Sequence, residues 1–110
     1  MGKFEITKRK NGEFQFNLKA GNGQVILTSE GYSSKSNCIN GIESVKKNSQ
    51  DDSKFERKTA VNGKAYFNLK ATNGQIIGSS QMYESEASRN NGIASVTTNA
   101  PGAEIVELLD

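Results

Sequence analysis

The chain repeats itself at a constant offset of 51 residues, and this duplication restricts the folds available to it. Residues 4–49 align with residues 55–100 without a gap, and 22 of these 46 positions are identical. Because the register never slips, loops as well as regular elements have equal lengths, so we expect one backbone in both copies. The spacing also continues beyond the second copy, since Phe4 corresponds to Phe55 and then to Val106. A strand in phase with the start of each copy should therefore end the chain.

Each copy begins with hairpin signals. In residues 14–20 and 65–71, apolar side chains alternate with polar ones, which predicts strands with one buried face and one wet face. Asn-Gly pairs separate the alternating segments, and such pairs favour type I′ turns, in which both central residues have positive φ. The sequence therefore predicts three antiparallel strands in each copy, with turns at Asn11-Gly12, Asn22-Gly23, Asn62-Gly63 and Asn73-Gly74.

The apolar period changes after the third strand of each copy. Ser34 precedes apolar residues spaced three and four apart, which is the pattern of a capped helix with one buried stripe. A glycine within that stripe disfavours the helix by about 1 kcal/mol, so we expect a close approach of helix and sheet in return. The stripes are Cys38, Gly41, Ile42 and Val45 in the first copy and Arg89, Gly92, Ile93 and Val96, behind Ser85, in the second.

These elements predict an α+β fold built from two tandem β-β-β-α-β repeats, about residues 3–53 and 54–110, within a single domain spanning 1–110. One sheet face and one helix stripe must be buried, which favours one mainly antiparallel sheet with both helices on one face. We expect residues 54–60 to end the first unit and to begin the second. The duplication predicts a monomer with internal pseudo-two-fold symmetry.

Three motifs resemble the YegP-like family of small proteins. They are F-x-L-K-A-x-N-G-x-x-I at 16–26 and 67–77, S-x-x-Y-x-S at 29–34 and 80–85, and N-G-I-x-S-V at 40–45 and 91–96. The resemblance implies three strands, a helix and a strand in each repeat, with terminal strands exchanged between the repeats, and single-repeat relatives that pair as dimers. It implies no activity. This chain departs from the family at four positions where alanine-like residues are usual. The four residues are Cys38, Ile39, Arg89 and Asn90, and these departures leave the expected fold unchanged.

The sequence offers little catalytic chemistry. It contains no histidine, so Ser-His and Cys-His nucleophile activation and imidazole metal sites are excluded. Cys38 lies on the apolar stripe and corresponds to Arg89, so we interpret it as a packed thiol. Asp51 and Asp52 are interpreted as a solvated turn, because no third acidic ligand is near in sequence. We expect no catalytic, cofactor-binding or metal-binding residue and no enzyme activity.

The sequence predicts a cytoplasmic protein with no membrane partner. No apolar run approaches the roughly 20 residues that span a bilayer. The N-terminal residues carry alternating charge where a secretory signal has an unbroken apolar stretch. A lone cysteine fits a reducing compartment.

The best candidate binding surface is the set of outward polar residues that recur on the first strands. Such a polar sheet face, or an exposed strand edge, favours a non-catalytic interaction module with a protein partner. The candidates are Asn17, Lys19, Gln24, Tyr66, Asn68, Lys70 and Gln75.

Two alternatives remain at this stage. Lys8, Arg9 and Lys10 form a candidate basic patch beside the first turn, so weak nucleic-acid binding through the basic first repeat, helped by Lys19 and Lys70, is the first alternative. The second is small-ligand binding or an unrecognised enzyme. It requires a concave pocket, which a small two-layer sheet seldom forms.

Overall fold

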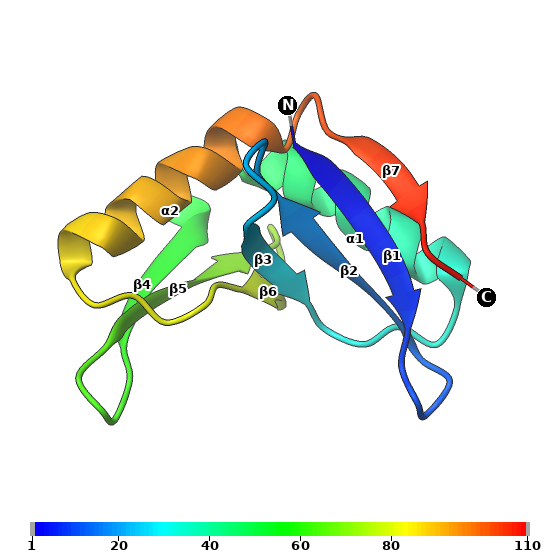
Figure 1. Cartoon of the computed structure of the whole chain (residues 1–110), viewed down its shortest axis with the longest axis horizontal. Helices are drawn as coiled ribbons and strands as arrows, with labels where there is room; N and C mark the ends of the chain where they lie inside the picture. The colour runs from blue at the N-terminus through cyan, green and yellow to red at the C-terminus, as the bar shows by residue number, and fades with distance from the viewer. Residues whose placement is uncertain (1, 110) are drawn as a thin grey trace.

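The computed structural model describes residues 2–109 and contains one seven-stranded sheet with two helices (Figure 1). The expected domain limits, 1 and 110, lie outside the described residues. The sheet order is β4-β5-β6-β3-β2-β1-β7. The elements are β1 (Lys3–Lys8), β2 (Phe14–Lys19), β3 (Val25–Ser29), α1 (Lys35–Asn48), a short 3-10 helix η1 (Asp52–Lys54), β4 (Phe55–Thr59), β5 (Ala65–Lys70), β6 (Ile76–Ser79), α2 (Glu86–Asn99) and β7 (Glu104–Glu107).

The two repeats exchange their terminal strands, as the resemblance implied. After α1, the chain enters β4, which pairs antiparallel with β5 of the second repeat. After α2, it returns to the first repeat, where β7 pairs with β1. The β1–β7 pair is parallel and every other strand pair is antiparallel, which confirms the mainly antiparallel sheet. The two halves meet at β3 and β6 through the pairs Thr28↔Ser79 and Ser29↔Gly78.

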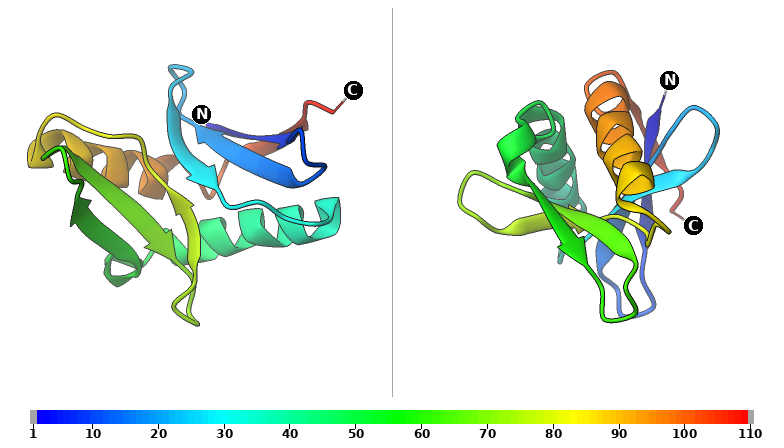
Figure 2. Two further views of the ribbon diagram at one scale, coloured as in Figure 1. Left: turned by 90° about the horizontal axis from the view of Figure 1, so that it is seen from below. Right: turned by 90° about the vertical axis from the view of Figure 1, so that its left-hand side faces the viewer.

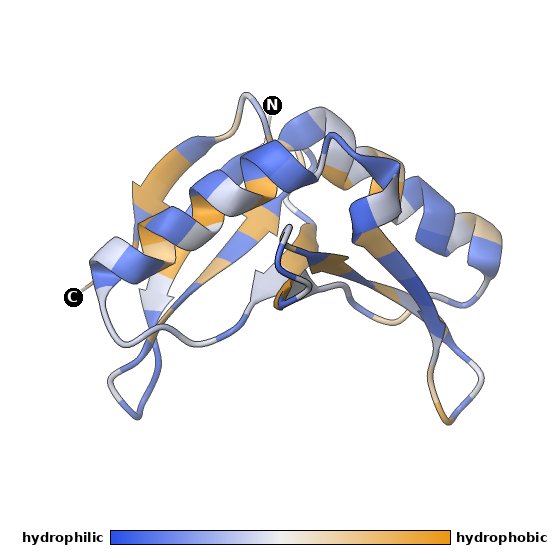
Figure 3. Cartoon of the chain, turned by 180° about the vertical axis from the view of Figure 1, so that it is seen from behind, coloured by the Kyte–Doolittle hydropathy of each residue, from blue (hydrophilic) through white to orange (hydrophobic). Residues whose placement is uncertain are grey.

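Both helices cover the same face of the sheet, as predicted (Figure 2). Ser34 and Ser85 cap them, each side-chain oxygen accepting a hydrogen bond from the backbone N–H three residues on. Hydrophobic residues alternate with hydrophilic ones along the strands (Figure 3), and the buried apolar side chains form one cluster with residues from both repeats. Edge-to-face phenylalanine pairs recur in it, with ring centroids 5.6 Å apart, at Phe4–Phe16 and Phe55–Phe67.

The four Asn-Gly turns are present, but the predicted turn type is wrong. Only the glycines have positive φ, and in the first turn Arg9 N–H donates to Glu13 O while Gly12 N–H donates to Arg9 O. This is a three-residue loop, a type I turn closed by a glycine bulge. The asparagine keeps negative φ because its side chain is occupied: Asn11 Oδ1 accepts from the backbone N–H of Glu13 at 3.0 Å. The other three turns repeat this arrangement.

The glycine within each helix accommodates a tyrosine, and at Gly41 the expected close approach to the sheet is present too, since a Cβ there would lie 3.1 Å from Phe16 Cε2. A Cβ atom at Gly41 would meet the hydroxyl of Tyr32 and lie 2.7 Å from its Cζ, and Gly92 stands in the same relation to Tyr83. Tyr32 bridges back to Phe14 through two backbone hydrogen bonds of 2.7 Å, which fixes the position of its ring. The helix therefore packs closely on the tyrosine of the S-x-x-Y-x-S motif.

The repeats differ where they meet. Leu27 of β3 corresponds to Gly78 of β6, and a Cβ at Gly78 would lie 2.8 Å from the carbonyl oxygen of Thr28 and 3.1 Å from Leu27 Cγ. Two neighbouring strands related by a pseudo-two-fold axis bring these positions together, so the Leu27 side chain occupies the space beside Gly78. This contact explains why this position departs from the repeat.

Neither α1 nor α2, the α-helices of the described residues, is long and apolar enough to cross a membrane, and the three-residue η1 is shorter still.

Candidate functional site

The repeated asparagines belong to a row of polar side chains that crosses the sheet on the face opposite the helices. Asn68 is only 6% exposed. Its Nδ2 donates to Glu56 Oε1 at 3.1 Å, and its Oδ1 accepts from Ser79 Oγ at 2.6 Å. Both hydrogen bonds join neighbouring strands. Consecutive cross-strand neighbours in the row are Glu56, Asn68, Ser79, Thr28, Asn17 and Glu5.

The repeated lysines are paired within the same row. Lys19 Nζ lies 3.0 Å from Glu5 Oε1, and Lys70 Nζ lies 3.1 Å from Glu56 Oε2. The hydrogen bond from Asn68, and then Lys70, hold the pKa of Glu56 below its usual range. Partly exposed ion pairs contribute little stability individually. Their recurrence nevertheless gives the outward lysines of both copies a structural role, and Asn68 has one through its two cross-strand hydrogen bonds.

Two of the remaining candidates lie outside the face that carries this row. Tyr66 is half-buried on β5, two residues from Asn68 and therefore on the same face, whereas Gln24 is exposed at the β2–β3 turn. Gln75 follows the β5–β6 turn and lines a pocket beside α1. The structure thus divides the seven predicted residues among three places, and their role in binding stays a prediction.

The candidate basic patch is partly neutralised. Arg9 Nε donates to Gln15 Oε1 at 2.6 Å, and Arg9 Nη1 lies 3.5 Å from Glu13 Oε1. Lys8 Nζ lies 5.4 Å from the centroid of the Phe14 ring, while Lys10 is exposed in the turn. Nucleic-acid binding stays a prediction, but several of the cations on which it depends have partners within the fold.

One edge of the sheet is open where the equivalent edge of the first repeat is covered. β1 has β2 on one side and β7 on the other, whereas β4 has only β5 as a neighbour among residues 2–109. The register of β4 with β5 repeats that of β1 with β2, since Phe4↔Leu18 corresponds to Phe55↔Leu69. An unpaired edge exposes backbone donors and acceptors that can template another strand. We call the outward side of residues 55–59 the β4 edge.

The first repeat shows which groups of the β4 edge are available. In an antiparallel ladder, alternate residues direct their N–H and C=O groups to opposite sides. The carbonyl of Ile6 accepts from the N–H of Leu108, which follows β7, at 2.9 Å. Arg57 corresponds to Ile6, so its backbone groups point outward from β4. Those of Phe55 and Thr59 do so too, because they lie two residues away on either side.

Side chains at the β4 edge differ in character from those at β1. Ile6 is fully buried, whereas Arg57 is exposed and its Nη2 lies 3.0 Å from Asp52 Oδ1. Arg57 Nε also approaches Asn90 Oδ1 on α2, at 3.4 Å. The sequence reasoning missed this site. One feature of the sequence could have indicated it: the apolar Ile6 of the first copy corresponds to the cation Arg57 in the second.

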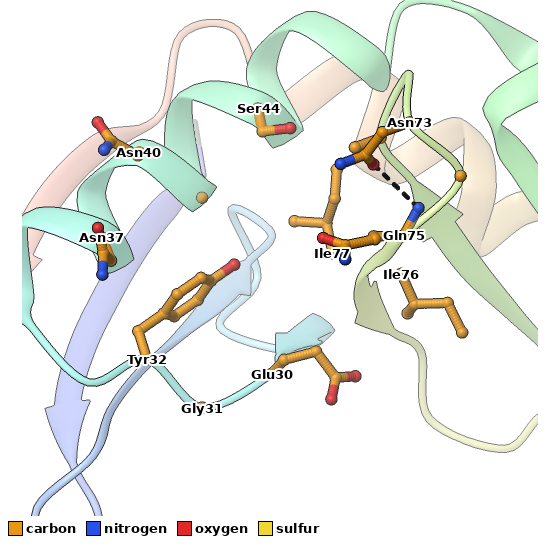
Figure 4. A pocket seen from close by; sticks show the side chains of 13 residues that line it. Glu30, Gly31, Tyr32, Asn37, Asn40, Ser44, Asn73, Gln75, Ile76 and Ile77 are labelled. Atoms are coloured by element: carbon orange, nitrogen blue, oxygen red, sulfur yellow. Dashed lines mark hydrogen bonds between the residues drawn. The ribbon is translucent and has the colours of Figure 1, made fainter.

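A second feature that the sequence did not predict is a pocket of about 830 Å³ between α1 and the β5–β6 turn (Figure 4). Tyr32 lies on one side of it, and Gln75 and Ile77 lie on the other. Burial, Cys38 and Glu30 raise the pKa of Tyr32, so its hydroxyl remains a hydrogen-bond donor at neutral pH. We expected no concave pocket in a sheet of this size. One forms because the β5–β6 turn extends toward the helix of the other repeat.

The cysteine thiol lies within the hydrophobic core. Cys38 is fully buried, and burial raises its pKa to about 11. The thiol therefore stays protonated, as expected for a packed cysteine. Within residues 2–109, no group of three or more His, Cys, Asp or Glu side chains is placed to hold a metal ion.

The sequence matches the family model described as "Domain of unknown function (DUF1508)" twice, over residues 10–56 and 60–107. The chain belongs to this family. The two matches in tandem are consistent with the duplication, and together with the relatives that follow they confirm the resemblance drawn from the motifs.

Relatives share the whole arrangement. The UPF0339 protein YegP of Escherichia coli (strain K12) is 58% identical over 98 residues, covering 89% of each chain. A UPF0339 protein encoded in the ptx operon 5′ region of Stutzerimonas stutzeri is 59% identical, over 97% of this chain and 96% of the relative. The solution structure of yegP from E. coli, described as a protein of unknown function, has a TM-score of 0.94 at 53% identity and covers 98% of this chain and 93% of that one.

A second solved structure agrees. The solution structure of a UPF0339 protein from Shewanella oneidensis has a TM-score of 0.93 at 54% identity, and it covers 98% of this chain and 92% of that one. The descriptions of these DUF1508 relatives state no reaction, ligand or partner.

Proposed function

We propose that the chain is a non-catalytic interaction module that binds an extended segment of another protein by adding it as a strand to the β4 edge. The observation that supports this proposal is the asymmetry of the sheet. The same strand position is paired with β7 in the first repeat and has no neighbour in the second within the described residues. In strand addition, backbone hydrogen bonds supply affinity and alternate side chains supply specificity. A cytoplasmic setting is part of this proposal.

The β4 edge also carries charged side chains that oppose uncontrolled strand pairing. Arg57 and Lys58 are exposed on β4, and charged residues on an edge strand oppose association with other edges. They do so by their positive charge, so a segment of opposite charge is not repelled. The edge therefore disfavours pairing with a second β4 edge and favours a segment of opposite charge.

The structure provides its own probe for the test. A peptide with the sequence of residues 102–109, GAEIVELL, contains the strand that covers the equivalent edge. It should be titrated into the ¹⁵N-labelled full-length protein and followed by amide chemical shifts. We expect shifts that concentrate on residues 55–59, and slower hydrogen exchange of the outward amides of Arg57 and Thr59.

The matched control is the same peptide with N-methyl groups on alternate residues. This change keeps the side chains and removes the backbone N–H donors along one edge of the peptide strand. We expect this peptide to leave residues 55–59 unshifted. Shifts at β1 and β7 in place of β4, or equal binding of the methylated peptide, would overturn the proposal.

The pocket favours a second candidate function, binding of an uncharged small ligand that carries hydroxyl or amide groups. Among the described residues, the side chains of Asn37, Asn40 and Gln75 make no hydrogen bond to the protein although they line the pocket. Amides both donate and accept, as hydroxyl groups do. The charged lining residue is Glu30, which disfavours anions such as nucleotides.

Amide side-chain signals test this second function. N-acetylglucosamine and maltotriose should shift the side-chain NH₂ signals of Asn37, Asn40 and Gln75, and ATP should not. Gln75→Ala should weaken the effect, whereas Gln24→Ala, at the corresponding position of the first repeat, should leave it unchanged. No shift with either sugar at 50-fold molar excess would count against this function.

A further inference from the structure

Arg89 of α2 is a buried cation without a carboxylate partner among residues 2–109. It is 7% exposed. Its Nε lies 3.4 Å from Asn90 Oδ1 and its Nη1 lies 3.5 Å from the carbonyl oxygen of Lys58, both long contacts to neutral groups. Its counterpart in the first repeat is the buried thiol of Cys38, so the fold does not require a charge here. Burial of an unpaired charge costs folding free energy, so we look for a function of Arg89 that offsets this cost.

The second guanidinium, that of Arg57, reaches the same amide oxygen. Arg57 Nε and Arg89 Nε each lie 3.4 Å from Asn90 Oδ1. The carboxylate in contact with this arginine pair is Asp52, which pairs with Arg57 and is itself 76% exposed. Of the two guanidinium groups beside the β4 edge, Arg57 thus has one solvated carboxylate as a direct partner, and Arg89 has none among residues 2–109.

The register of β7 on β1 shows which residue of an added strand would meet the arginine pair. Glu107 lies beside Ile6, and its carboxylate reaches Lys35 Nζ at the start of α1, at 3.1 Å. The corresponding position on β4 is Arg57. Lys35 corresponds to Glu86, so the start of α2 carries a carboxylate where α1 carries that cation, and the positive charge on this side of β4 comes from Arg57 and Arg89.

We propose that the arginine pair, Arg57 and Arg89, binds the carboxylate of an acidic residue that an added strand places opposite Arg57. Arg57, the more exposed of the two, donates to the carboxylate directly. Arg89 adds its charge from the helix side, and Asn90 holds the two guanidinium groups in place. This inference rests on the proposed strand addition and specifies its partner: an extended acidic segment.

The experiment compares two peptides on the full-length protein. One has the sequence of residues 102–109, and the other carries the change Glu107→Gln, which removes one charge and keeps the size. Charge-assisted hydrogen bonds are about twice as strong as neutral ones, so we expect the Glu peptide to bind about tenfold more tightly at low salt. This ratio should fall as salt is added, because the Arg57 contact is partly exposed.

Protein variants locate the preference. Arg89→Met and Arg57→Gln should each reduce the ratio of the two affinities toward one, with the Gln peptide still binding at residues 55–59. Arg9→Met is the matched control, because it removes one positive charge from the other repeat and should leave the ratio unchanged. Thermal unfolding and amide spectra of each variant establish that it is folded.

The outcomes separate the two proposals. Equal affinities of the Glu and Gln peptides, both at the β4 edge, would overturn the role of the arginine pair and leave strand addition standing. The same would follow if Arg9→Met changed the ratio as much as Arg89→Met. Failure of both peptides to bind at residues 55–59 would overturn strand addition itself.

Discussion

Replacement of Gly41 by alanine tests the contact between helix α1 and Tyr32. In an ordinary helix this change stabilises by about 1 kcal/mol, because glycine loses more backbone entropy than alanine. Here the new methyl group would meet the Tyr32 hydroxyl and lie 2.7 Å from Tyr32 Cζ and 3.1 Å from Phe16 Cε2. The ring cannot move aside freely, since it stacks on Phe16 with centroids 6.2 Å apart.

Overpacking of this kind costs about 1–3 kcal/mol, which exceeds the gain in helix propensity. We therefore expect Gly41→Ala to lower the free energy of unfolding by about 1 kcal/mol, within the range known for overpacked sites. In a Tyr32→Leu background, the obstacle is absent and the same change should raise the free energy of unfolding by about 1 kcal/mol. The coupling energy between the two positions is then about 2 kcal/mol, within the range for contacting residues.

The assay is urea unfolding at neutral pH, followed by far-ultraviolet circular dichroism, for the four proteins of this cycle. Glu43→Ala, on the exposed side of the same helix, is the control for helix propensity alone. If Gly41→Ala stabilises the wild-type background as much as the Tyr32→Leu background, the tyrosine does not restrict this helix.

Three further outcomes follow from the structure. Gly78→Ala should destabilise by about 1–3 kcal/mol in the same unfolding assay, because the new Cβ would lie 2.8 Å from the backbone carbonyl of Thr28; an unchanged midpoint would contradict the packing at the junction of the repeats. Cys38, with its pKa raised to about 11, should resist iodoacetamide at pH 8 until urea unfolds the chain, and rapid labelling of the folded protein would show that the thiol is accessible. The hydrogen bond from Asn68 lowers the pKa of Glu56, so the folded protein favours the charged carboxylate. The resulting stabilisation is complete above the pKa that Glu56 has in the unfolded chain. It is lost as the pH falls through the lower pKa of the folded protein. The stability difference between wild type and Glu56→Gln should therefore shrink between pH 7 and pH 3, and a constant difference would contradict this role.

Sequence periodicity predicted the elements well because each repeated signal has a local physical cause. Alternation of apolar and polar residues along 14–20 indicates a half-buried strand. The serine before each helix caps it through a local hydrogen bond that does not depend on where the helix packs. The turn type was wrong for a local reason as well. Two turn geometries accept Asn-Gly, and the choice between them depends on whether the asparagine side chain bonds the backbone two residues on, as Asn11 does.

What the sequence did not reveal depends on contacts between the repeats. The reason for glycine at position 78 is the presence of Leu27 on a neighbouring strand, which only the sheet order brings close. The open β4 edge likewise follows from where β7 goes after α2, and within residues 54–60 the available signal is Arg57, which corresponds to the buried Ile6. Searching for repeated polar residues led to the structural row of Asn68, whereas the candidate site lies at a position that the repeats do not share.

The covering of β1 by β7 does not close the sheet, because β7 itself has only β1 as a neighbour among residues 2–109. The sheet therefore has two edge strands of unlike charge, β4 with Arg57 and Lys58 and β7 with Glu104 and Glu107. A contact between unlike surfaces repeats from copy to copy unless its rotation closes a ring. The last strand of the chain thus sets the direction in which an assembly of copies would grow.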